Sequence, residues 1–276
     1  MPGSIERIMG KAVAALKSVR GIRAVMLGGS RARGNHRADS DMDIGIYYAD
    51  SDTLDLAALN NVAGQLDDAR RRDLIAPPGA WGPWVDGGAW LTVDGLPVDF
   101  IFRNVGRVAS VIRECRKGIV YANYQPGHPH AFINAMYMGE LAIGKLLWEA
   151  GSDVSTLKAE AEVYPDALRS ACIRSFLFEA EFSGMLAGKS AGRGDIYYVT
   201  AHVVRSISCL NQVLFALNRE YCLNEKGAVR LVERFAVRPE SYGRRVEEIV
   251  ARLDADARQA CSLLDGLVCD VQRLAA

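Results

Sequence analysis

The chain has 276 residues, of which 50% are hydrophobic and 24% charged, a composition typical of a globular protein of one or two domains. Its 33 basic and 33 acidic side chains cancel, which disfavours a dedicated nucleic-acid-binding protein because such proteins usually carry a basic excess. No apolar run approaches the roughly 18 residues of a membrane span, and the first segment lacks a signal-peptide pattern, so we expect a cytoplasmic protein. The six cysteines form no C-x-x-C pair, which predicts reduced thiols.

The first half of the chain mixes helix and strand patterns. Helices are expected where apolar residues recur three or four positions apart, at residues 1–20, 53–66 and 104–116, the second with Thr53 as its cap. Short apolar runs predict strands at residues 24–27, 44–48, 89–93 and 96–102. Asp94-Gly95 separates the last two runs, and Asp-Gly between apolar runs is the strongest short signal for a β-hairpin.

The second half has an almost purely helical pattern. Helices are expected at residues 131–150, 167–186, 196–219, 226–235, 242–253 and 255–274. The segment Pro126-Gly127-His128-Pro129 marks the expected domain boundary. The sequence therefore predicts an α+β protein, with a catalytic domain at residues 1–125 and a helical substrate-binding domain at residues 126–276. A ligand cleft is expected between the two domains.

The most informative motif joins the turn Gly28-Gly29-Ser30 to Asp41 and Asp43. In a strand, side chains two positions apart leave the same face, so the two carboxylates aim at one point. Carboxylates this close repel each other unless a cation lies between them. Hard oxygen ligands suit Mg²⁺, which usually comes with substrate phosphates, and the backbone N–H groups of such a turn are suited to hold phosphates.

A third carboxylate, Asp99, lies in the expected strand 96–102, between Val98 and Phe100. A charge in this setting has a desolvation cost unless it is paired or bound to a metal ion. The alternative interpretation is a salt bridge to an arginine such as Arg103.

The motif resembles that of the DNA polymerase β-type nucleotidyltransferase superfamily over residues 22–103. That pattern is Gly-[Gly/Ser]-Ser, about ten residues, Asp-x-[Asp/Glu] and a later Asp, and it is met here without substitution by Gly29, Ser30, Asp41, Asp43 and Asp99. Residues 29–34 and the Ser-Asp-x-Asp segment resemble the bacterial small nucleotidyltransferases. These include minimal enzymes and aminoglycoside- and lincosamide-modifying enzymes, some of which carry a helical C-terminal domain.

The resemblance implies a nucleotidyltransferase fold with a small mixed sheet and flanking helices. It implies that Asp41, Asp43 and Asp99 are catalytic and hold two Mg²⁺ ions. It also implies a nucleoside triphosphate as co-substrate, and ATP is the one we expect. The phosphates are expected at the turn formed by Gly28, Gly29 and Ser30.

Further nucleotide contacts are expected from Arg31, Arg33, Ser40 and Lys226. The alternative for Arg31 and Arg33 is solvent-facing charge, and for Lys226 an exposed helix lysine. Asp86 is the candidate general base, because some related drug-modifying enzymes place a carboxylate near this region; its alternative role is that of a turn residue.

Other polar and aromatic residues have simpler interpretations. Trp81 and Trp84 lie in a Gly/Pro-rich loop, where they either stack on a base or sugar or, as we favour, anchor the loop. His128 and His130 lie in the expected linker, which favours a structural or solvated role. Asp195 precedes a helix, which favours capping.

Three functions fit the pattern. The first is transfer of a nucleoside monophosphate to a hydroxyl of a small molecule, such as an aminoglycoside- or lincosamide-like antibiotic, with release of pyrophosphate. The second is nucleotidylation of a tRNA end or a protein side chain, as in toxin–antitoxin systems; the sequence has no long basic stripe to favour RNA. The third is a non-catalytic nucleotide-binding module, which the intact carboxylates disfavour. No membrane contact is expected, and the chain is a monomer or a homodimer.

Overall fold

The computed structural model describes residues 2–276, with side chains from residue 5 onward, and the chain divides into two compact units. Unit 1 contains the residues up to Arg113 together with Tyr137–Val163, and unit 2 contains Glu114–Met136 and Tyr164–Ala276. The chain therefore changes unit after residues 113, 136 and 163. The sequence predicts a single boundary after residue 125, so the observed division is more interleaved than the expected one.

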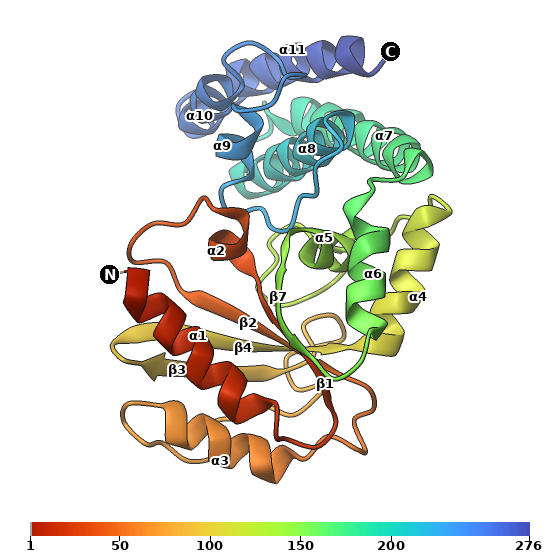
Figure 1. Ribbon diagram of the computed structural model, residues 1–276. Helices are drawn as coiled ribbons and strands as arrows, with labels where there is room; N and C mark the ends of the chain where they lie inside the picture. The colour runs from red at the N-terminus through yellow and green to blue at the C-terminus, as the bar shows by residue number, and fades with distance from the viewer. Residues whose placement is uncertain (1) are drawn as a thin grey trace. The chain divides into compact units, whose positions relative to one another are not determined.

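Unit 1 is built on a sheet of order β3-β4-β2-β1-β7. The sheet contains β1 (Ile22–Leu27), β2 (Met42–Tyr48), β3 (Gly88–Val93), β4 (Leu96–Asn104) and β7 (Lys145–Glu149), which are labelled in Figure 1. β2 and β4 pair in parallel, whereas the other neighbours are antiparallel. The predicted hairpin around Asp94-Gly95 is confirmed, since Val93 pairs with Leu96.

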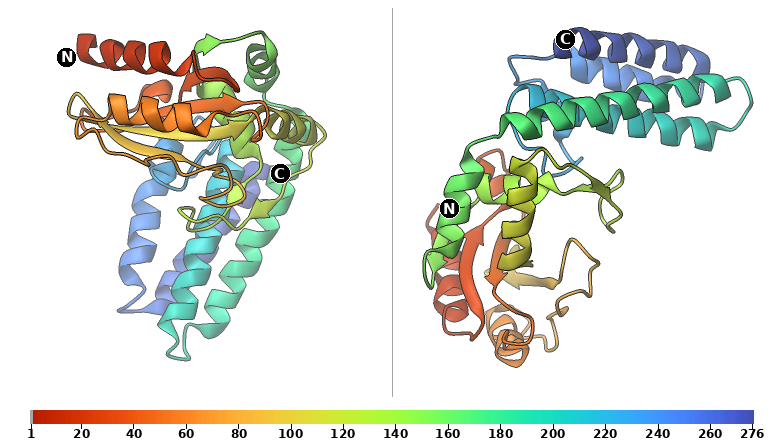
Figure 2. Two further views of the ribbon diagram at one scale, coloured as in Figure 1. Left: turned by 90° about the horizontal axis from the view of Figure 1, so that it is seen from below. Right: turned by 90° about the vertical axis from the view of Figure 1, so that its right-hand side faces the viewer.

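The hydrophobic core of unit 1 lies between this sheet and two helices, α1 (Pro2–Leu16) and α3 (Leu56–Leu66), which run along one face (Figures 1 and 2). Alternation in the strands decides which side chains enter the core. In β2 the core side chains are Met42, Ile44, Ile46 and Tyr48. The residues between them, including Asp43, therefore project from the opposite face.

The start of α3 differs from the sequence prediction. The helix begins at Leu56, and Asp55 caps it by accepting a hydrogen bond from the Ala58 N–H at 2.9 Å. Thr53 instead donates its hydroxyl hydrogen to the Asp50 carbonyl oxygen, as a turn residue does.

The helix predicted over residues 131–150 is wrong in its second half. α5 (Ala135–Ile143) ends at Gly144, and the next residues form β7, which pairs with β1 as an outer strand of the sheet. Gly144 permits this change of direction, because a Cβ there would lie 2.7 Å from the Glu140 carbonyl oxygen. A short apolar run fits a helix and a strand equally well, so periodicity could not separate the two.

The remaining helices that begin in unit 1 are short. α2 (Gly29–Arg33) follows β1, α4 (Val105–Arg116) follows β4, and α6 (Asp153–Glu162) follows β7. The sequence patterns predict α4 closely but do not predict α6.

Unit 2 is mainly helical. Its long helices α7 (Asp166–Ser190) and α8 (Ile196–Leu217) pack side by side, and α11 (Ala257–Ala275) contacts both (Figure 2). The unit also contains α9 (Ala228–Val232), α10 (Tyr242–Arg252) and a two-stranded sheet of β5 (Ala122–Asn123) and β6 (Phe132–Ile133). The predicted fold class, a small mixed sheet with helices followed by a helix-rich region, is confirmed.

Candidate active site

Three side chains lie in one row across the sheet of unit 1. Asp43 of β2 is the register partner of Asp99 in β4, and Asp99 is in turn opposite Trp90 of β3. Side chains directly opposite each other leave the same face, with Cβ atoms about 4.5–5.5 Å apart in an antiparallel pair. The row therefore projects from the face opposite α1 and α3.

The carboxylates of Asp41, Asp43 and Asp99 interact with one another. The pKa of Asp99 is raised to about 6, first because burial disfavours its charged form and then because of the negative charges of Asp43 and Asp41. Arg103 does not form the alternative salt bridge with Asp99, because its guanidinium donates to both carboxylate oxygens of Glu140 at 2.7 Å. The three carboxylates thus form one electrostatic group.

The Gly28-Gly29-Ser30 turn packs against Asp43. The Gly28 N–H donates to the Asp43 carbonyl oxygen at 2.8 Å. Gly29 has φ of +58°, and a Cβ at this position would lie 1.8 Å from Oδ2 of Asp43. Only glycine therefore lets the chain pass this close to the carboxylate, and Ser30 follows in the first turn of α2.

Arg31 and Ser40 hold the segment that leads into Asp41. The Arg31 side chain is buried, and its guanidinium donates to the carbonyl oxygens of Ser40, at 2.5 and 3.2 Å, and Asp41, at 3.0 Å. The Ser40 hydroxyl accepts a hydrogen bond from the Arg37 N–H at 2.9 Å. These bonds use Nε and Nη2 of the guanidinium, and the phosphate contact of Arg31 that the sequence predicts stays a prediction. Arg33 ends α2, and its nucleotide contact stays a prediction.

Asp86 lies far from the row of carboxylates. Its carboxylate accepts a hydrogen bond from the hydroxyl of Tyr48. From Asp43 to Tyr48 the register runs five residues along β2, which is about 16 Å at a rise of about 3.3 Å per residue. This position does not fit the general-base role that the sequence suggests for Asp86. The bond instead contributes, after burial, to raising the pKa of Tyr48.

Lys226 belongs to unit 2 and is exposed there. Its backbone N–H donates to the side-chain oxygen of Asn224 at 2.8 Å. Its contact with a triphosphate stays a prediction.

Trp90 is a candidate site residue that the sequence reasoning missed. Its side chain is 63% exposed, and its ring stacks on Trp81 with centroids 4.5 Å apart and planes 17° apart. Trp84 anchors the loop as expected, because it is buried and its carbonyl accepts a hydrogen bond from the Tyr137 hydroxyl at 2.6 Å. Counting back from the Asp94-Gly95 turn would have placed Trp90 opposite Asp99.

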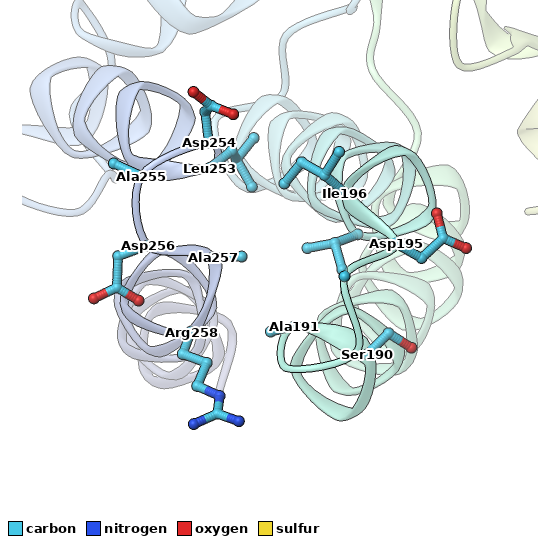
Figure 3. A pocket seen from close by; sticks show the side chains of 12 residues that line it. Ser190, Ala191, Asp195, Ile196, Leu253, Asp254, Ala255, Asp256, Ala257 and Arg258 are labelled. Atoms are coloured by element: carbon cyan, nitrogen blue, oxygen red, sulfur yellow. The ribbon is translucent and has the colours of Figure 1, made fainter.

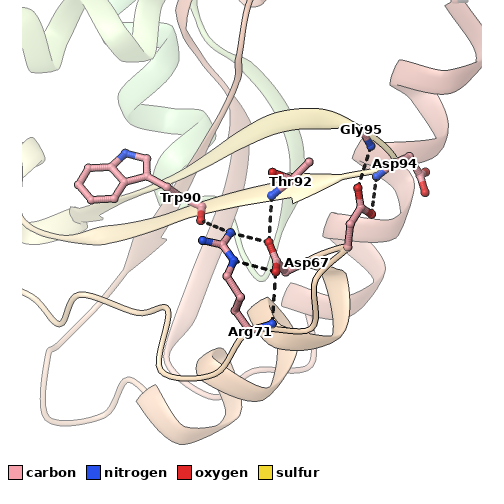
Figure 4. Close-up of polar contacts among 7 residues, drawn as sticks. Asp67, Arg71, Trp90, Thr92, Asp94 and Gly95 are labelled. Carbon is pink, nitrogen blue, oxygen red and sulfur yellow. Dashed lines mark hydrogen bonds and ion pairs between the residues drawn. The ribbon is translucent and has the colours of Figure 1, made fainter.

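A buried carboxylate supports the hairpin that carries Trp90 (Figure 4). Asp67 accepts hydrogen bonds from the Thr92 N–H at 3.0 Å and from the Arg71 guanidinium at 2.6 and 2.9 Å. Arg71 also donates to the Trp90 carbonyl oxygen at 3.0 Å, and its hydrogen bond is the main reason that the pKa of Asp67 is lowered. Arg71, expected as part of a solvated helix end, therefore fixes β3 in place. Asp68 accepts from the N–H groups of the hairpin turn.

A hollow of about 390 Å³ lies in unit 2 between the α7–α8 and α10–α11 turns (Figure 3). Two of its acidic side chains cap helices. Asp195 accepts from the Tyr198 N–H at the start of α8, as the sequence predicts, and Asp256 accepts from the Gln259 N–H at the start of α11. Both carboxylates therefore have structural partners.

Two family models match the chain. Residues 11–76, which include the glycine turn and the first two aspartates, match the model described as "Polymerase beta, Nucleotidyltransferase". Residues 133–226 match "Domain of unknown function (DUF4037)". The sheet, the turn and the carboxylates of unit 1 define a nucleotidyltransferase domain. The match over residues 11–76 assigns this part of unit 1 to the DNA polymerase β-type nucleotidyltransferase superfamily.

Among solved structures, a nucleotidyltransferase-like protein from Exiguobacterium sibiricum 255-15 is similar, with a TM-score of 0.45 and 10% sequence identity. The match covers 98% of this chain and 74% of that chain. No curated protein matches the sequence. Over residues 2–276, none of the helices combines the length and the apolar character that crossing a membrane requires.

Proposed function

We propose that this chain transfers a nucleoside monophosphate from a nucleoside triphosphate to a hydroxyl of a small-molecule acceptor, with release of pyrophosphate. The observation that carries this proposal is the register of Asp43 with Asp99, beside a turn that only Gly29 allows to approach Asp43. A phosphate-holding turn and convergent carboxylates at one edge of the site are the parts that in-line nucleotidyl transfer needs.

The donor set fits divalent metal ions. The mutual repulsion of Asp41, Asp43 and Asp99, visible in the raised pKa of Asp99, is relieved when cations bind between them. Carboxylate oxygens are hard ligands that favour Mg²⁺ over softer metals. Bound there, the ions would neutralise phosphate charge and lower the pKa of the acceptor hydroxyl.

The residues of the turn have different roles in binding the phosphates. The Gly28 N–H is already bonded to the Asp43 carbonyl, so Gly28 contributes through its backbone path rather than as a donor. The backbone N–H groups of Gly29 and Ser30 and the Ser30 hydroxyl are the donors that we assign to the phosphates. Arg31 keeps Asp41 in position through its bonds to the backbone.

The acceptor side lies at the other end of the row. Gly28, Asp43, Asp99 and Trp90 follow one another across β1, β2, β4 and β3, so a nucleotide held at the turn leaves Asp99 and Trp90 to the acceptor. An exposed tryptophan face stacks well on sugar or aromatic rings and attracts ammonium groups. This combination of an aromatic face with carboxylates favours a ring-bearing cationic molecule, such as an aminoglycoside-like antibiotic.

The test is pyrophosphate release by the purified chain with Mg²⁺ and each labelled nucleoside triphosphate, with and without a panel of aminoglycosides and lincosamides. Release that depends on a small acceptor supports the proposal. Label retained on RNA or on protein supports a macromolecular acceptor, and nucleotide binding without release supports a non-catalytic module.

Two carboxylate variants make this test specific. Asp43→Asn is expected to lower the rate at least about 100-fold, because one carboxylate ligand of the proposed metal ions is lost. Asp86→Asn is the matched control: it removes a carboxylate at the far end of β2 and should keep the rate. Full activity of the Asp43 variant would overturn the metal-dependent mechanism.

A further inference from the structure

A second group of metal-ligating side chains lies within unit 2, away from the residues used above. His130 lies just before β6, Glu179 on α7 and Cys209 on α8. One donor atom of each residue lies within 4.8 Å of the other two. Cys209 is buried and the other two are half-buried, so this is not a chance meeting of exposed acidic groups. We propose that these three residues bind a zinc ion.

The spacing of the two strongest donors fits tetrahedral zinc. Sγ of Cys209 and Nε2 of His130 are 3.7 Å apart. Ligands at about 2.3 Å (sulfur) and about 2.1 Å (nitrogen) from a tetrahedral zinc ion are separated by about 3.6 Å. The two side chains therefore need little movement to share one ion.

The kinds of donor select the metal. A thiol, an imidazole and a carboxylate together suit Zn²⁺, whereas Mg²⁺ and Ca²⁺ prefer oxygen ligands alone. Three protein ligands also leave a fourth position for water or a small ligand. His130 lines a hollow of about 550 Å³ together with Tyr197, His202 and Arg205, through which such a ligand can reach the site.

The surroundings hold the ligands in place. The His130 N–H donates to Oε1 of Glu225 at 2.9 Å, which fixes the segment that presents the imidazole. Oε1 of Glu179 is buried and forms an ion pair with the guanidinium of Arg205, and the Glu179 side chain is hydrogen-bonded to Cys209. A carboxylate has two oxygens, so an ion pair at Oε1 is compatible with metal ligation through the other. Such polar partners commonly orient metal-binding carboxylates.

The test uses the full chain, stripped of metal by a chelator and then titrated with Co²⁺ in excess Mg²⁺, which occupies the carboxylates of unit 1. We expect one Co²⁺ per chain with a thiolate-to-cobalt charge-transfer band, and displacement of that band by Zn²⁺. The readout is optical and needs no substrate, so it is independent of transferase activity.

Three variants decide which residues bind. Cys209→Ser should abolish the charge-transfer band, and His130→Gln should weaken Zn²⁺ binding at least about tenfold. Because Cys209 is buried, helix content by circular dichroism checks its folding, and the half-buried His130 provides the second test. Cys269→Ser, at an exposed cysteine, is the control and should bind like the unaltered chain. Absence of the band in the unaltered chain, unchanged Zn²⁺ affinity in His130→Gln, or loss of the band only in Cys269→Ser would overturn the proposal.

Discussion

Replacing Asp99 by asparagine is expected to abolish nucleotidyl transfer and, in the absence of metal ions, to stabilise unit 1. The pKa of Asp99 rises from 3.8 to about 6 because of burial and of the neighbouring Asp43 and Asp41. At about 1.4 kcal/mol per pKa unit, this corresponds to about 3 kcal/mol against the charged form at neutral pH. Asp99 is only half-buried, so solvent screening reduces the expected gain in stability to about 1–2 kcal/mol.

The sign follows from proton linkage. The folded chain keeps a proton on Asp99 that the unfolded chain releases at lower pH, so the stability contributed by this group is present below about pH 4. It is lost as the pH rises through about 6. The advantage of Asp99→Asn over the unaltered chain should therefore be largest above pH 7 and about half as large at pH 5.

The assay is urea denaturation in a chelator at pH 5 and pH 7.5, followed by tryptophan fluorescence. The chain has 4 tryptophans, at positions 81, 84, 90 and 148, and all lie in unit 1, so the signal reports on that unit alone. When Mg²⁺ replaces the chelator, it should stabilise the unaltered chain more than the variant. The reasoning is refuted if Asp99→Asn is no more stable than the unaltered chain at pH 7.5, or if its gain is the same at both pH values.

Three further substitutions test the site and its support. Gly29→Ala places a methyl group against the Asp43 carboxylate and should lower the rate at least about 100-fold, measured by pyrophosphate release; a rate within a few fold of normal would contradict the close approach. Trp90→Ala should raise the KM for the acceptor about tenfold, as the loss of one stacking contact does, while the KM for the nucleotide stays constant; equal effects on both would refute an acceptor contact. Asp67→Ala leaves the partners of a buried carboxylate unpaired and should cost at least about 1–3 kcal/mol in urea denaturation. Because its pKa is lowered, the stability that Asp67 contributes should disappear as the pH falls below about 4, and a loss that does not depend on pH in this range would point to packing alone.

Local sequence signals predict the parts of the site that depend on neighbouring residues. The Gly28-Gly29-Ser30 turn follows a buried strand, and the Asp94-Gly95 hairpin pairs β3 with β4, as expected. The alternation in the strands also puts Asp43 and Asp99 on one face. These features need only strand period and turn chemistry, both of which can be read from short segments.

Features that depend on distant contacts were not predictable in the same way. Arg31 has the sequence context of an exposed arginine, yet its burial follows from the path of residues 37–41, which brings two carbonyl oxygens to its guanidinium. Asp86 depends on Tyr48, which is 38 positions away, for its hydrogen bond. β7 is a strand because it pairs with the edge of β1, and the local sequence of residues 145–149 does not indicate that edge.

The interleaving of the two units limits how the chain can be divided for experiments. A fragment ending at residue 125 would lack β7 and leave the N–H and C=O groups of β1 at an open sheet edge, which invites aggregation. Deleting the C-terminal part of the chain therefore removes part of the sheet of unit 1 unless residues 137–163 are kept. Expressing unit 1 by itself needs a splice that joins residue 113 to residue 137 through a linker. A chain that ends between these positions therefore loses β7 of unit 1 as well as most of unit 2.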